Sequence, residues 1–101
     1  MALRAIALLS TLAMLAPAPT YAKEHRDPHQ RALFMKKHPC PANGNTRGAC
    51  PGYVVDHVKP LCAGGADHPS NMQWQTREEA KIKDRREVEQ CRRFRSQHYG
   101  R

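Results

Sequence analysis

The longest hydrophobic run of the chain lies at its N-terminus, and shorter apolar groups are spread over the rest. Ala5–Leu15 is almost entirely apolar and follows the positive charge of Arg4. This order is typical of a secretory signal peptide, and Pro17 ends the run well short of the roughly 20 apolar residues that span a bilayer. We therefore predict a signal peptide over residues 1–22 and an exported protein, periplasmic or secreted. An uncleaved N-terminal anchor is the alternative.

The apolar pattern after the leader predicts a β-hairpin followed by a helix. Tyr53–Val58 is rich in β-forming residues, and Met72–Gln75 alternates as a short second strand would. Pro60–Ser70, with two adjacent glycines, predicts the loop between them. Thr76–Glu79 is a capping box, and the helix predicted over Arg77–Arg93 has no glycine or proline inside. The fold class is therefore α+β.

The segment before the hairpin is predicted to be an N-terminal extension over residues 23–38, followed by one domain over residues 39–101. Lys23–Gln30 is polar and suggests a flexible start, whereas Arg31–Lys37 carries enough apolar residues for a short helix or an apolar anchor. The predicted core is apolar and comes from the hairpin, the loop and the last helix. It consists of Trp74, Val54, Val58, Leu61, Ile82 and Val88.

Four cysteines follow the leader: Cys40, Cys50, Cys62 and Cys91. An even number in an exported chain of roughly 80 residues favours two disulfides, because so small a core needs staples. Three pairings are possible, and we favour Cys40 with Cys50 and Cys62 with Cys91. A structural zinc site is the competing interpretation, but the sequence lacks the close C-x-x-C pairs typical of such sites.

The charge balance predicts polyanionic partners. The chain carries 17 Lys and Arg against 9 Asp and Glu, a formal net charge of +8. Such a surface favours nucleic acid or, less specifically, an acidic cell envelope. Basic residues crowd the last helix, where Lys83 and Arg86 are our candidate phosphate contacts. No membrane contact is expected after leader removal, and we expect a monomer; the sequence does not say whether an immunity protein exists.

One constellation of residues carries candidate chemistry. In chain order it consists of Val54–Leu61 with its Asp56-His57 pair, Gly64-Gly65, Pro69–Gln73 with Asn71, and the capped helix. This order and spacing resembles the core of HNH endonucleases, small ββα-metal nucleases, over Gly52 to Glu87. The resemblance implies a hairpin-plus-helix fold and metal-dependent hydrolysis of phosphodiester bonds in DNA with low sequence specificity. RNA is the alternative substrate.

The resemblance assigns roles that also have a physical basis. It makes His57 the general base, and histidine has an unperturbed pKa suited to deprotonating water near neutral pH. It makes Asp56 a metal ligand, and a hard carboxylate oxygen suits Mg²⁺, with Mn²⁺ or Zn²⁺ as alternatives. It gives Asn71 the task of holding the loop, for which an amide that both donates and accepts is well suited.

The helix departs from the family pattern at Ala80, where a histidine or asparagine ligand is usual. Alanine cannot bind metal, so we take Asp84, one turn further on the same face, as the candidate replacement. The departure also supports an alternative function, a catalytically inactive nucleic-acid-binding module on the same scaffold. A third interpretation, a cationic envelope or antimicrobial protein, does not explain the spacing of Asp56, His57 and Asn71.

Overall fold

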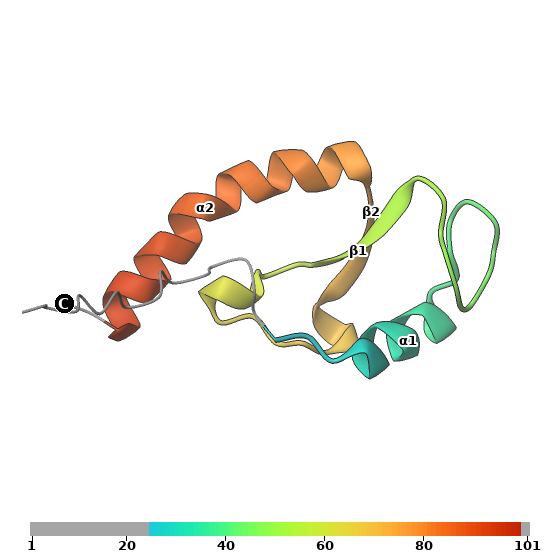
Figure 1. The fold of residues 1–101 in the computed structure, drawn as a ribbon, viewed down its shortest axis with the longest axis horizontal. Helices are drawn as coiled ribbons and strands as arrows, with labels where there is room; N and C mark the ends of the chain where they lie inside the picture. The colour runs from blue at the N-terminus through green and yellow to red at the C-terminus, as the bar shows by residue number, and fades with distance from the viewer. Residues whose placement is uncertain (1–24, 100–101) are drawn as a thin grey trace, which may run out of the picture.

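The computed structural model describes residues 25–99, so the predicted signal peptide lies outside the described residues. In chain order the elements are α1 (Pro28–Lys37), β1 (Tyr53–His57), two 3-10 turns (Leu61–Ala63 and Pro69–Asn71), β2 (Met72–Thr76) and α2 (Arg77–Tyr99). Figure 1 shows the hairpin in the middle, α2 along one side of it and α1 on the other. This is the predicted α+β architecture of a hairpin plus a C-terminal helix.

The hairpin is an antiparallel pair in which Tyr53 faces Thr76 and His57 faces Met72. The first strand ends at His57, one residue before the predicted boundary. The Val58 amide still donates to the Asn71 carbonyl oxygen at 2.8 Å, although the Val58 side chain is exposed. The last strand pair is His57 with Met72, and the second strand continues to Thr76, one residue further than predicted.

Helix α1 begins earlier than the polar composition of Lys23–Gln30 suggested. The Asp27 carboxylate accepts from the His29 amide at 3.0 Å, and Pro28 occupies the first helical turn. An N-cap acid followed by proline is a strong helix start, so the prediction of a flexible segment up to Gln30 was wrong for its last three residues. Pro39 ends the helix by disfavouring helical geometry at His38.

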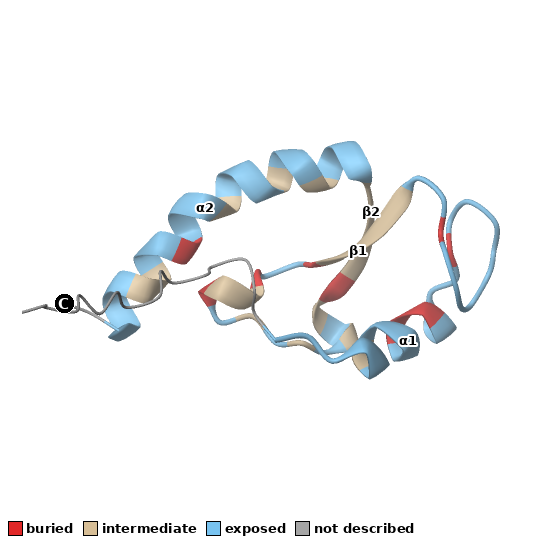
Figure 2. Cartoon of the chain, viewed as in Figure 1, coloured by how far each residue is buried: buried red, intermediate tan, exposed pale blue. Residues whose placement is uncertain are grey.

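The core lies between α1 and the hairpin rather than under α2. Met35, Cys40 and Cys50 form the buried cluster, with Tyr53 and Trp74 packed against it. Figure 2 shows that most of α2 is exposed. A two-stranded hairpin offers α2 too narrow a surface to bury a full helix face.

Three of the predicted core residues are consequently wrong. Val58, Ile82 and Val88 are 52%, 48% and 67% exposed. Trp74 does pack on the core cluster, with its ring centroid 5.7 Å from that of Phe34. Trp74, Val54 and Leu61 are half-buried, so none of the six predicted core residues is fully buried.

The disulfide pairing agrees with the favoured prediction. Cys40 bonds Cys50 across the turn-rich loop, and Cys62 bonds Cys91. No cysteine of residues 25–99 is free, which excludes the zinc interpretation for these four. The second bridge ties the turn after β1 to the middle of α2 and so fixes the helix relative to the strand that carries His57.

Helix α2 starts with the predicted capping box. The Thr76 amide donates to Glu79 at 2.9 Å, and the Glu79 amide donates to the Thr76 hydroxyl at 3.1 Å. The helix runs to Tyr99, six residues past the predicted end at Arg93, because no helix breaker precedes Gly100. Within residues 25–99, no helix has the length and apolar character needed to cross a membrane.

Candidate active site

His57 lies at the end of β1, and its imidazole is the one buried polar side chain among the described residues, with 8% exposure. Its Nε2 is 2.9 Å from Oδ1 of Asp67 in the loop that joins the strands. Asp67 is not among the site residues predicted from the sequence. The sequence signal for this contact was the position of Asp67, ten residues after His57. It lies in a loop that has to bring the chain back to pair with the strand that carries His57.

The carboxyl of Asp67 has a pKa below its ordinary value. The Asp27 amide, which donates to Oδ2 at 2.7 Å, is the main cause; burial opposes the shift, and the His57 ring and the Arg26 guanidinium add to it. Asp67 is therefore an ionised acceptor at neutral pH, and Nε2 of His57 must be the donor. In the neutral ring the lone pair is then on Nδ1, as a general base requires.

Asn71 joins the two ends of the loop. Its amide nitrogen donates to the Lys59 and Ala66 carbonyl oxygens at 2.9 and 2.8 Å, and its Oδ1 accepts from the Lys59 amide at 2.9 Å. These contacts are the loop-holding interactions predicted for this residue. Its effect on catalysis stays a prediction.

The Gly64-Gly65 pair permits the close return of the loop. The Gly65 amide donates to the Pro60 carbonyl oxygen at 2.9 Å, and a Cβ on Gly65 would overlap the Lys59 carbonyl oxygen. Gly64 has φ of +88°, and a Cβ there would lie 2.8 Å from the Phe94 ring of α2. Gly65 is therefore required because a Cβ would overlap backbone atoms, and Gly64 is required mainly because its positive φ is strained for other residues.

Asp56, the predicted metal ligand, already contacts a cation of the protein. Lys83 on α2 places Nζ 2.8 Å from Oδ2 of Asp56, and Gln73 donates to the same oxygen at 3.3 Å. Lys83 also donates to the His57 carbonyl oxygen at 2.7 Å and pairs with Glu87. Burial lowers the pKa of Lys83, but its contacts with Asp56 and Glu87 outweigh that effect and leave the pKa above its ordinary value.

The residues near Asp56 do not fit a divalent cation held by the protein alone. Among residues 25–99 no group of three His, Cys, Asp or Glu side chains could hold a metal. Asp84 is exposed on α2 and lines the same pocket as Asp56, but the Lys83 ammonium is already on Asp56. The metal role of Asp56 and Asp84 stays a prediction, and we derive no chemical step from it.

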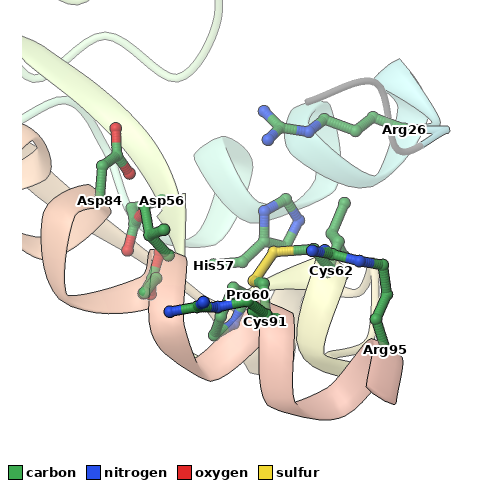
Figure 3. Close-up of a pocket in the computed structure, with 12 residues that line it drawn as sticks. Arg26, Asp56, His57, Pro60, Cys62, Asp84, Cys91 and Arg95 are labelled. Atoms are coloured by element: carbon green, nitrogen blue, oxygen red, sulfur yellow. A yellow bond between two sulfur atoms is a disulfide. The ribbon is translucent and has the colours of Figure 1, made fainter. Parts of the chain in front are cut away.

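A pocket of about 430 Å³ adjoins His57 between β1, the turn after it and α2. Its charged lining consists of three arginines and three acids: Arg26, Arg92, Arg95, Asp56, Asp84 and Glu87. In the view of Figure 3, Asp56 and Asp84 lie on one side of His57, Arg95 lies on the other side, and the guanidinium of Arg26 lies above the imidazole. Arg86, a predicted phosphate contact, is exposed on α2 and does not line this pocket.

Comparisons of this chain with protein-family models, with curated proteins and with solved structures find no match.

Proposed function

We propose that this chain is a nuclease of the HNH kind that hydrolyses phosphodiester bonds in DNA, with His57 as the general base. The observation that carries the proposal is the His57–Asp67 pair at 2.9 Å, beside a pocket lined by arginines. A buried histidine oriented by a carboxylate is a common arrangement for proton abstraction, and it lies on the hairpin, loop and helix that the resemblance implies. The resemblance and the pair are independent observations.

The reaction uses one water molecule for each bond that is cleaved. Nδ1 of His57 takes a proton from the water, whose oxygen then bonds to phosphorus while the bond from phosphorus to the leaving sugar oxygen breaks. The leaving oxygen takes a proton from solvent, and the imidazolium later returns its proton to solvent. Asp67 holds the ring and stabilises its charged form, as a carboxylate partner does for other catalytic histidines.

The arginines in the pocket lining favour an anionic polymer as substrate. Arg26 and Arg92 border the same pocket as His57, and guanidinium groups bind phosphate oxygens through paired donors. Phosphate contacts of this kind position a duplex without reading its bases, which is consistent with low sequence specificity. The two disulfides are consistent with action outside the cytoplasm.

Cleavage of supercoiled plasmid by the oxidised protein tests the proposal. We expect His57→Ala to lower the rate on the order of 100-fold or more, because a general base contributes that much. His29→Ala is the matched control, since this histidine is exposed on α1 and away from the pocket. Equal rates for the two variants would refute the role of His57.

A catalytically inactive nucleic-acid-binding module is the second candidate. Two observations favour it, the alanine at position 80 and the ion pair that already engages Asp56. In that case the protein would shift plasmid in a gel without cutting it under any metal. Binding would weaken steeply as salt increases, because phosphate contacts release counterions.

A further inference from the structure

The ammonium of Lys83 lies among three oxygen atoms next to the wall of the His57 pocket. It is 2.8 Å from Oδ2 of Asp56 and 2.7 Å from the His57 carbonyl oxygen, and it pairs with Glu87. Two carboxylates and a carbonyl are the oxygen ligands that hard divalent cations take in proteins. An ammonium is therefore at the centre of a ligand set that would suit a metal.

All three side chains are partly shielded from solvent. The Lys83 side chain is 18% exposed, and those of Asp56 and Glu87 are each 14% exposed. Charges at such sites are screened less by salt than surface charges are. A divalent cation that approached Asp56 would meet the repulsion of the ammonium and would have to displace it from all three oxygens.

The charge of the pocket depends on this ammonium. The three arginines and three acids of the lining cancel in formal charge, while Lys83 lies behind Asp56 and Glu87 and adds one positive charge. Without it, two neighbouring carboxylates on the wall would repel an approaching phosphate. The lysine therefore offsets part of the negative charge of these two carboxylates on this side of the pocket.

We infer that Lys83 is the resident cation of this site, so that Asp56 binds no divalent metal in the wild-type protein and phosphodiester hydrolysis proceeds without one. The inference rests on the proposed nuclease function and departs from the magnesium requirement that the resemblance implies. Lys83 is a positioning residue, because it acts through Asp56 and Glu87 and does not itself line the pocket.

Plasmid cleavage in chelator and in Mg²⁺ provides the first test. We expect the wild-type rate to change less than about twofold when chelator is added. Without metal, the cleavage rate of Lys83→Met should be on the order of 100-fold below that of the wild type, because one preorganised electrostatic group is removed. The rate should recover when Mg²⁺ occupies the vacated position. Lys81→Met, an exposed lysine on the same helix, is the control and should behave as wild type.

Binding of Mn²⁺ alone, followed by paramagnetic broadening of amide signals in NMR spectra, gives a readout that needs no activity. We expect no broadening centred on Asp56 and His57 in the wild-type protein. Such broadening should appear in Lys83→Met and disappear again in Lys83→Met combined with Asp56→Asn. The wild-type titration is decisive even where Lys83→Met folds poorly.

The outcomes separate this inference from the proposed function. Cleavage that depends on His57 and stops in chelator, or Mn²⁺ bound at Asp56 of the wild type, would overturn the inference and leave the nuclease in place. Absence of any cleavage that depends on His57 would overturn the nuclease, while the Mn²⁺ titration would still decide whether Lys83 excludes metal.

Discussion

Replacement of Asn71 should lower the free energy of unfolding more than any surface substitution in this chain. Its amide makes three side-chain hydrogen bonds, two to the Lys59 backbone and one to the Ala66 carbonyl oxygen. Each such bond contributes about 0.5–1.5 kcal/mol, so Asn71→Ala should cost about 2–4 kcal/mol. Asn71→Asp should cost at least as much, because it keeps one accepted bond but places a carboxylate against two carbonyl oxygens.

The assay is urea unfolding of the oxidised protein, followed by the fluorescence of Trp74. The matched control is Asn43, whose Oδ1 accepts from the Asn45 amide at 3.0 Å in an exposed turn. Asn43→Ala should cost less than about 1 kcal/mol and Asn43→Asp about 0.5 kcal/mol or less, since the carboxylate keeps that bond. If Asn71→Asp unfolded at the wild-type urea concentration, the loop-holding role would be refuted.

Three further predictions concern the loop, the core and the loss of stability at acid pH. Gly65→Ala should lower the free energy of unfolding by about 1–3 kcal/mol, because the added Cβ would overlap the Lys59 carbonyl oxygen. An unchanged melting temperature in thermal unfolding would contradict this. Trp74→Phe should lower the free energy of unfolding, followed by circular dichroism, by about 1–2 kcal/mol, because it removes the 2.7 Å hydrogen bond from the indole to the His38 carbonyl oxygen. A variant as stable as the wild type would show that this bond contributes nothing. The amide of Asp27 holds the folded-state pKa of Asp67 below its ordinary value, so this group stabilises the fold above the unfolded-state pKa and loses its contribution as the pH falls through the folded-state pKa. The stability difference between wild type and Asp67→Asn should therefore be full at neutral pH and shrink below about pH 4; a difference that stayed constant with pH would contradict the assignment.

The hairpin, the capped helix and the asparagine could be predicted because their signals are local. The strand residues are bounded by glycine and proline, and Thr76 and Glu79 satisfy each other's helix-start amides within four positions. Asn71 could be predicted because a side-chain amide that donates and accepts suits a loop that returns on itself. The even number of cysteines indicated two disulfides but left three pairings open, and the structure has the favoured one, in which Cys62 of the central loop bonds Cys91 of the last helix.

The core and the partners of the site residues required the tertiary structure. Burial depends on what covers a side chain, and α1 rather than α2 covers the hairpin, so Ile82 and Val88 are exposed although they are apolar.

The contact of His57 with Asp67 depends on how the loop folds back, and the contact of Lys83 with Asp56 depends on the angle at which α2 leaves the hairpin. By itself the sequence determined which residues carry charge and where the chain turns. Only the packing of helix on hairpin decided that Lys83 lies beside Asp56, because electrostatic contacts between distant positions form only once the backbone has brought them within a few ångströms.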